Sequence, residues 1–190
     1  MSSKAAIIFQ SLRRRAPVLA AVAGLAVMAG AGQTMPDGRP TPTGLEVPRW
    51  ISLKSSHVRA RQGPGLDYPI LWEYRAAGLP VQVIAETREW RKICDPEGSV
   101  AWIHRTVASG RRGVFNTGAR EVTLHSGRSE RSAVKARLSP RSLIGLDECR
   151  DGWCRIGAHR LHGWARQDAL FGTQERALCD AARPAGPQPD

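Results

Sequence analysis

The stretch VRARQGPGLDYPIL, residues 58–71, places a Gly-Pro-Gly turn between two short segments of mixed apolar and charged residues. Pro64 suits the second position of a β-turn because its φ is fixed, and Gly65 suits the third position of a type II turn, which needs a positive φ. Pro69 favours an extended residue before it, so the loop is expected to lead into a strand. Because no helix follows, the segment predicts the rim of a β structure and not a phosphate-binding loop.

The sequence around this turn repeats weakly farther along the chain. Trp90 and Trp102 in the first copy match Trp153 and Trp164 in the second. The spacing between the matched tryptophans is longer than the period of most solenoid repeats, so it predicts two copies of a compact domain. We expect Trp90 and Trp153 to lie in the two cores, because large aromatic side chains at repeated positions are usually buried.

Both copies are made of short segments rich in Val, Ile and Trp, separated by turn residues. No segment keeps a helical period for long, so the chain predicts two tandem all-β barrels, residues 50–110 and 111–172. Each unit is near the size at which core burial barely offsets chain entropy, so docking of the units and disulfides are expected to add stability. The predicted strands are WISLK, HVRAR, LPVQVIAE, EWRKIC and VAWIHR in the first unit, and EVTLH, AVKARL, SLIGLDE, GWCRI and HGWAR in the second.

The first unit resembles the bacterial SH3-like (SH3b) domain family through VRARQGPGLDYPIL, GLPVQVIAETREWRKI and VAWIHRTVASGRR. The second unit resembles it less closely, through DGWCRI and HGWARQDAL, and the pair is similar to two-copy exported proteobacterial members. Ala60 departs from the residue usual in the family, which leaves the expected fold unchanged. The resemblance implies small β-barrels that act as targeting or binding modules for peptidoglycan or peptides.

Flat aromatic faces and arginines near the Gly-Pro-Gly turn are the candidate ligand contacts, for sugars or peptides and for acidic stem peptides respectively. The second copy lacks both the Pro-Gly turn and an equivalent of Tyr68, so a groove is expected in the first unit only and the second unit is expected to be mainly structural. The candidate ligand-binding residues are Arg59, Arg61, Asp67, Tyr68, Trp72, Tyr74 and Trp102.

The chain begins with Lys4, three arginines at 13–15 and an uncharged run that ends in small residues. This layout predicts a secretory signal peptide at residues 1–31, cleaved between Ala31 and Gly32, with an uncleaved membrane anchor as the alternative. Contact with the membrane would then be transient, and the protein periplasmic. Pro, Gly and Thr dominate residues 32–49, which predicts a flexible linker, and residues 173–190 predict a similar tail.

The chain is basic, with 28 Lys and Arg against 17 Asp and Glu and a net charge of +11. A basic exported protein is attracted to acidic cell-wall polymers or anionic headgroups. Its arginines are scattered and form no stripe, so nucleic acid is not an expected partner. The sequence leaves the oligomeric state open.

Four cysteines in an exported chain favour disulfides. Cys149 and Cys154 flank the turn Arg-Asp-Gly and are expected to pair across a hairpin, whereas Cys94 and Cys179 form a possible second pair.

Cys149 and Cys154 also form the pattern C-x4-C-x4-H-x2-H with His159 and His162. This spacing is not that of known structural zinc sites, and strand alternation would turn the two histidines to opposite faces. We therefore expect no metal and no other cofactor.

Cys94 and His104 could be drawn as a catalytic dyad, but no third orienting group is evident and the chain has no room for a separate catalytic domain. The sequence thus predicts a non-catalytic exported binding module for cell-wall peptidoglycan. The alternative is an interaction or scaffold module for other envelope proteins. A cell-wall hydrolase is the weaker alternative.

Overall fold

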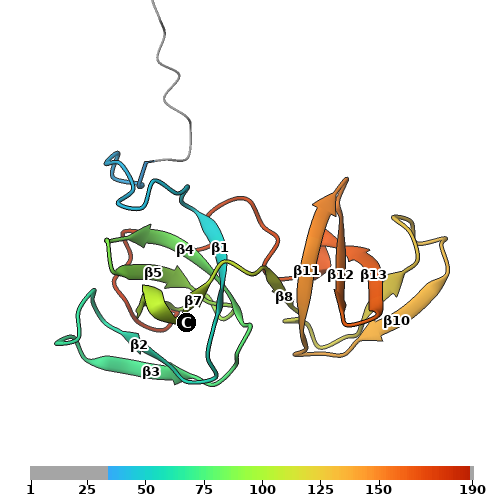
Figure 1. The fold of residues 1–190 in the computed structure, drawn as a ribbon, viewed down its shortest axis with the longest axis horizontal. Coiled ribbons are helices and arrows are strands. Elements are labelled where there is room, and N and C mark those ends of the chain that lie inside the picture. The colour runs from blue at the N-terminus through green and yellow to red at the C-terminus, as the bar shows by residue number, and fades with distance from the viewer. Residues whose placement is uncertain (1–33, 189–190) are drawn as a thin grey trace, which may run out of the picture.

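The computed structural model describes residues 34–188. The predicted signal peptide and its cleavage point between Ala31 and Gly32 lie outside these residues. The described chain forms two antiparallel β units side by side, linked by a short connection (Figure 1). The predicted all-β fold with two tandem units is confirmed. Its helical elements are two three-residue 3-10 turns, η1 (Arg105–Val107) and η2 (Gln167–Ala169), so no helix of residues 34–188 could span a membrane.

The first unit is a seven-stranded sheet in the order β3-β2-β6-β5-β4-β1-β7, and the second is a six-stranded sheet in the order β10-β9-β13-β12-β11-β8. The first six strands of the first order correspond to the six strands of the second, and only β7 has no counterpart among the described residues, which confirms the repeat. The strands of the first unit are β1 (Arg49–Leu53), β2 (Val58–Arg61), β3 (Ile70–Tyr74), β4 (Pro80–Glu86), β5 (Trp90–Cys94), β6 (Val100–His104) and β7 (Ala108–Ser109). Those of the second are β8 (Gly113–Phe115), β9 (Val122–His125), β10 (Val134–Leu138), β11 (Leu143–Arg150), β12 (Trp153–Ala158) and β13 (Leu161–Arg166).

All ten predicted strands are present within a residue or two of their expected bounds. Strand β3 begins at Ile70, where the loop after the Gly-Pro-Gly turn was expected to enter a strand. Strands β7 and β8 are only two and three residues long, too short for an alternating pattern to reveal them.

A tight hairpin joins β11 and β12 at Asp151 and Gly152, whose φ values are 52° and 75°. Two successive positive φ values are those of a type I′ turn, which fits the twist of the flanking strands. The turn sets Cys149 directly opposite Cys154, with their Cα atoms 4.0 Å apart, and the two are disulfide-bonded as predicted.

The two units share one hydrophobic core. Phe115 of β8 is buried in the core of the first unit, and Leu143 and Phe171 of the second unit pack against that core. The Phe171 ring meets Trp50 of β1 edge to face, with ring centroids 4.9 Å apart. The backbones of Phe115 and Phe171 exchange two hydrogen bonds of 2.9 and 3.0 Å, so both rings are fixed where the units meet. The rest of this core comprises Ile51, Leu53, Val58, Ala60, Tyr74, Leu79, Val81, Val83, Ile93, Ala101 and Ile103.

The second unit has in addition a smaller core of its own, built mainly from β9, β12 and β13. Its members are Val114, Leu124, Leu138, Cys154, Ile156, Ala165 and Leu170. Fewer and smaller buried side chains than in the first core indicate that the second unit depends on docking for part of its stability.

Residues 173–188 run back across the first unit, and we call this segment the strap. The indole of Trp50 donates a 2.6 Å hydrogen bond to the carbonyl of Gln174. The Gln82 side chain donates to the carbonyl of Arg176 and accepts from the amide of Leu178. The strap therefore begins by satisfying polar groups of β1 and β4.

A disulfide then fixes the middle of the strap. Cys179 is bonded to Cys94 of β5, which confirms the second pair, and the two cysteines pack with Ile84 and Val100 in a small apolar cluster. Farther on, Gly186 exchanges two backbone hydrogen bonds with Val100. The prediction of a flexible tail is therefore wrong for residues 173–188. Its Pro- and Gly-rich composition can bury little by itself, but the disulfide and the backbone pairing hold it on the sheet.

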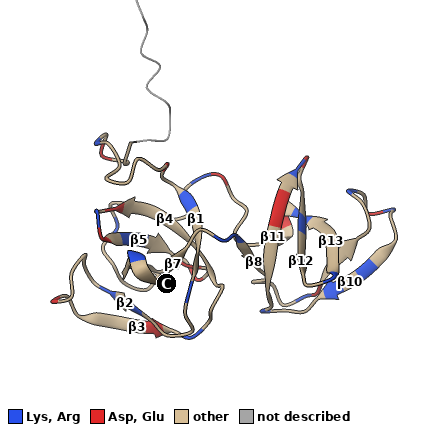
Figure 2. Ribbon diagram, viewed as in Figure 1, with Lys and Arg blue, Asp and Glu red and all other residues tan. Residues whose placement is uncertain are grey.

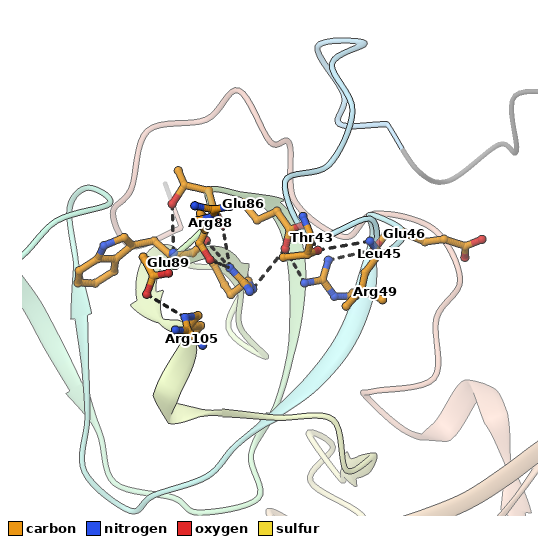
Figure 3. A network of polar contacts seen from close by, with 11 residues as sticks. Thr43, Leu45, Glu46, Arg49, Glu86, Arg88, Glu89 and Arg105 are labelled. Carbon is orange, nitrogen blue, oxygen red and sulfur yellow. Dashed lines mark hydrogen bonds and ion pairs between the residues drawn. The ribbon is translucent and has the colours of Figure 1, made fainter.

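The segment before β1 is also attached, through the buried carboxylate of Glu86 (Figure 3). This carboxylate accepts hydrogen bonds from the backbone amide and hydroxyl of Thr43, and it pairs with Arg49 at 2.5 Å and Arg91 at 3.3 Å. Burial by itself would raise the pKa of Glu86, but the bonds from Thr43 and Arg49 hold it below its ordinary value. The predicted linker at residues 32–49 is therefore anchored at its C-terminal end.

Replacing Phe115 by Ala should lower the free energy of unfolding by about 3–5 kcal/mol, because it opens a cavity in the shared core. The loss should appear in both units, so urea unfolding followed by tryptophan fluorescence should remain a single transition at lower urea. Leu66→Ala removes an exposed side chain and serves as the control. Unfolding of Phe115→Ala at the midpoint of the parent protein would contradict the shared core.

The two disulfides should differ in their effect on stability. Cys94 and Cys179 are 85 residues apart and close a long loop, whereas Cys149 and Cys154 are 5 apart. On the chain-entropy model, Cys94→Ala with Cys179→Ala should cost about 4–5 kcal/mol and the Cys149→Ala, Cys154→Ala pair about 2 kcal/mol. Urea midpoints of the two double variants measure this, and equal losses would argue against a stabilising role for the strap.

Candidate ligand-binding groove

The Gly-Pro-Gly turn is built around the ring of Tyr68. Gly65 does not have a positive φ, so the predicted type II turn is wrong. The amide of Gly65 instead donates to the carbonyl of Gly63 across Pro64, at 3.0 Å. A Cβ at Gly63 would overlap the Tyr68 ring, and one at Gly65 would lie 3.2 Å from it. The close approach of this ring therefore leaves no room for a side chain at Gly63, and a Cβ at Gly65 would press against the ring.

Arg61 fixes the loop that carries Tyr68. Its guanidinium donates to the carbonyl oxygens of Leu66 and Tyr68, at 2.9 and 2.7 Å. These bonds use donors that the sequence analysis assigned to a ligand. Arg61 therefore positions the loop, while the flanking side chains Leu66 and Tyr68 remain exposed to solvent.

Beside this loop lies a groove of about 520 Å³ on the first unit. Strand β2 and its partner β3 supply one wall, and β5, β6 and the η1 turn supply the other. Its lining residues are His57, Arg59, Arg61, Leu66, Glu73, Trp90, His104 and Val107. Strand alternation explains the first wall, because Val58 and Ala60 point into the core and the residues between them face outward.

A charged group lies on the wall formed by β2 and β3. The imidazole of His57 bonds the carboxylate of Glu73 at 2.6 Å, and Arg59 lies opposite Glu73 in the strand register. The bond from His57 lowers the pKa of Glu73, and the nearby charges of Arg75 and Arg59 act in the same direction. Arg59 itself is exposed and forms no ion pair with a carboxylate of residues 34–188. Its cation is available to an anionic ligand.

The opposite wall combines an aromatic ring with a histidine. Trp90 and His104 are cross-strand partners whose rings meet edge to face, 5.2 Å between centroids. His104 bonds the hydroxyl of Thr106 at 2.8 Å and lies 3.5 Å from Glu89. Trp90 is 8% exposed and Trp153 is 7% exposed, which confirms both as core residues. Trp90 thus presents only an edge to the groove.

The structure separates the predicted aromatic contacts. Tyr74 is buried, and its hydroxyl bonds Asp95 at 2.9 Å, so it has no free face for a ligand. Burial, followed by the charge of Asp95, raises the pKa of the Tyr74 hydroxyl far above its ordinary value. Trp72 packs against the first core beside Tyr74, because both alternate with the outward Glu73 along β3. Neither belongs to the groove.

The remaining candidates lie at or near the groove. Arg59 and Arg61 line it, whereas Asp67 and Tyr68 are exposed on the adjacent loop and Trp102 is half-buried opposite Arg61 in the strand register. The other lining residues are not among the predicted contacts: His57, Leu66, Glu73, Trp90, His104 and Val107. Strand alternation predicts two of them. His57 lies two residues before Arg59 on the same outward face, and Glu73 lies opposite Arg59 on the neighbouring strand.

The second unit lacks the same set of side chains at the corresponding positions. The partner of Trp153 across the strands is Arg166, where the first unit has His104 opposite Trp90. The Arg166 guanidinium lies over the Trp153 ring, 5.7 Å from its centroid, and covers the face of the ring. Thr123 stands next to Val122 where Arg59 follows Val58, so the unit also lacks the exposed cation.

The suspected metal ligands are engaged elsewhere. Cys149 and Cys154 are disulfide-bonded to each other, and His162 bonds Asp147 at 2.9 Å and the carbonyl of His159 at 3.0 Å. Within residues 34–188 no group of three or more His, Cys, Asp or Glu is arranged to hold a metal ion.

A family model described as "Bacterial SH3 domain" matches the chain twice, at residues 54–110 and 118–172. The chain belongs to the bacterial SH3 domain family. The first match contains β2 to β7 and the second contains β9 to β13, whereas β1 and β8 lie just before the matches to their units. The groove lies on the first of the two matched units, beside the loop that carries the Gly-Pro-Gly turn.

Two solved structures show limited similarity to this bacterial SH3 protein. NlpC2 from Trichomonas vaginalis is 16% identical with a TM-score of 0.29, covering 64% of this chain and 47% of that one. NlpC1 from the same organism is 14% identical with a TM-score of 0.31, covering 70% and 49%. The chain thus spans about half the length of each structure. No curated protein matches the sequence.

Substituting Gly63 by Ala should displace the Tyr68 ring and cost about 1–3 kcal/mol, the usual range for overpacking. In a Tyr68→Ala background the same substitution should cost little, because the ring that it meets is gone. Urea unfolding of the four proteins in this double-mutant cycle gives the coupling. Gly110→Ala is the matched control, since a Cβ there meets nothing within 4 Å. Additive effects of the two substitutions would contradict the proposed packing.

Proposed function

We propose that this protein is an exported, non-catalytic binding module whose first unit binds the peptide part of peptidoglycan. The observation that carries the proposal is the groove beside the β2–β3 hairpin. It combines the unpaired cation of Arg59 with the carboxylate of Glu73 and with the apolar surfaces of Leu66, Trp90 and Val107. Binding sites typically have this composition, a largely apolar lining with a few convergent polar groups.

The charges of the groove suit an acidic stem peptide. Arg59 is positioned to pair with a ligand carboxylate, and an arginine can do so through two parallel hydrogen bonds. Glu73 has a depressed pKa, so it stays ionised at neutral pH and can accept a bond from a ligand amine or amide. Small apolar side chains of the peptide would contact Leu66 and the edge of Trp90. Without the four basic residues of the predicted signal peptide the chain has a net charge of +7, which adds a general attraction to an acidic wall.

The disulfides support a location outside the cytoplasm. Both pairs, Cys94–Cys179 and Cys149–Cys154, are structural and would persist in an oxidising compartment. Membership of the bacterial SH3 domain family agrees with a role in the cell envelope. Together with the signal-like N-terminal sequence, these features favour the periplasm.

The state of Cys94 supports a role without catalysis. A Cys-His mechanism needs a free thiolate, but this cysteine is bonded to Cys179. His104 lies at the other end of the β5–β6 pair, where it contacts Thr106 and Glu89. The residues considered for a hydrolase dyad thus have structural partners.

One feature favours binding to an envelope protein as a second candidate function. Strand β3 is the edge of the first sheet, so an extended segment of another protein could pair with its free side. Leu66, Tyr68 and Ile70 are exposed next to this edge, at 73%, 46% and 48%. An edge strand with exposed apolar neighbours is a typical site for added strands.

Co-sedimentation with purified sacculi tests the main proposal. The protein should sediment at low salt and release as salt increases, because the arginine contact is screened. Arg59→Gln should weaken sedimentation about threefold to fivefold, in the range of one exposed ion pair. Arg131→Gln removes an exposed arginine of the second unit and is the matched control.

Equal sedimentation of Arg59→Gln and Arg131→Gln would contradict the proposal that the groove binds peptidoglycan. No sedimentation at low salt, together with a protein captured by cross-linking at Tyr68 in cells, would favour the second candidate function.

A further inference from the structure

A second hollow, separate from the groove, lies where the two units meet. This cleft has a volume of about 630 Å³. Its walls come from the end of β1, the turn before β4, the connection between the units and the start of β11. It shares no lining residue with the groove. The residues that line it are Ser52, Leu53, Lys54, Ala77, Gly78, Ser109, Arg111, Arg112, Gly113, Leu143, Ile144 and Gly145.

The cleft has cations and no carboxylate among its lining residues. Lys54, Arg111 and Arg112 are all exposed, and none of them forms an ion pair with an acidic residue in the part of the chain that the structure describes. Figure 2 shows Lys and Arg on the connection that leads into β8, between the two units. Three unpaired cations around one hollow repel one another, so a bound anion would relieve that repulsion.

The other lining residues make the cleft suitable for more than a free ion. Ala77, Leu143 and Ile144 add partly exposed apolar surface from both units. A ligand that carries its charge at one end and a small apolar part at the other would contact both kinds of surface. Ser52, 4% exposed, also lines the cleft, and its hydroxyl has no hydrogen-bond partner within residues 34–188.

The walls are held in place without a ligand. The carbonyl of Arg112 accepts from the amide of Leu146 at 3.1 Å, and one nitrogen of its guanidinium donates to the carbonyl of Gly172 at 2.9 Å. Phe115, which is buried in the shared core, follows Arg112 by three residues and fixes the end of this connection. A preformed cleft loses less entropy on binding than a flexible one.

We propose that the cleft between the two units binds the oxyanion of a small ligand, a carboxylate or a phosphate, with the apolar part of that ligand against Ala77 and Ile144. Lys54 and Arg111 contact the oxyanion, and Arg112 orients the wall while adding charge. The site requires both units, because neither supplies the full set of lining residues alone. The second unit therefore completes a binding site in addition to stabilising the first.

NMR titration of the ¹⁵N-labelled protein tests this site with three probes: N-acetyl-Ala-Ala with a free carboxylate, the same dipeptide as its C-terminal amide, and inorganic phosphate. The free dipeptide or phosphate should shift the amides of residues 52–54, 77–78, 109–113 and 143–145, and the neutral amide should not. Larger shifts from the dipeptide identify a peptide carboxylate, and larger shifts from phosphate identify a phosphate-bearing polymer.

The variant Lys54→Gln with Arg111→Gln should weaken binding at the cleft about tenfold, given two exposed ion pairs. Arg59→Gln is the control, because it alters the groove and should leave the cleft unchanged. Unchanged sacculus binding of Arg59→Gln, with the cleft titration intact, would contradict the proposed function of the groove and leave the cleft site standing. No shift at the cleft with either anion, or equal affinity in the double variant, would overturn the proposal.

Discussion

The packing of Phe115 and Phe171 into the core of the first unit is the interaction on which the rest of the molecule depends. Each barrel alone is near the lower limit at which apolar burial offsets chain entropy. The two phenylalanines come from the second unit but complete the first core, and Trp50 packs on Phe171 from the other side. The strands therefore form two separate sheets, but side chains of the second unit pack into the core of the first, so the two units form one packed body.

Covalent and polar attachments strengthen the same body on the faces away from the hairpin of β2 and β3. The strap covers Gln82, Lys92 and Val100 and is fixed by Cys179, while the segment before β1 is anchored on Glu86. The β2–β3 hairpin itself is left uncovered, with β3 at the sheet edge. The groove beside it is thus an accessible concave surface of the first unit that is free of the strap.

The sequence predicted the fold well because the fold depends on local signals. Alternating apolar residues, repeated tryptophans and the Asp-Gly turn each act over a few residues, and the structure confirms the strands and the Cys149–Cys154 pair. Turn propensity alone predicts a type II turn for the Gly-Pro-Gly stretch. Its glycines are instead explained by the ring of Tyr68, three residues after Gly65, which packs against both of them.

The candidate site was harder to predict because it depends on which face each side chain takes. Arg59 lines the groove, whereas Tyr74, another predicted ligand contact, is buried against Asp95. His57 and His104 are brought together only by the pairing of β2 with β6, which no local pattern shows. Composition alone predicts a flexible tail, because it does not reveal that Cys179 is cross-linked to Cys94 of β5.

Native-state hydrogen exchange tests the central claim, that the two barrels form one cooperative body around a shared core. The slowest amides of β5 in the first unit and β12 in the second should open with the same free energy, equal to that of global unfolding. Exchange from β12 at a free energy well below that of β5 would contradict the account, because it would show a second unit that unfolds while the first stays folded.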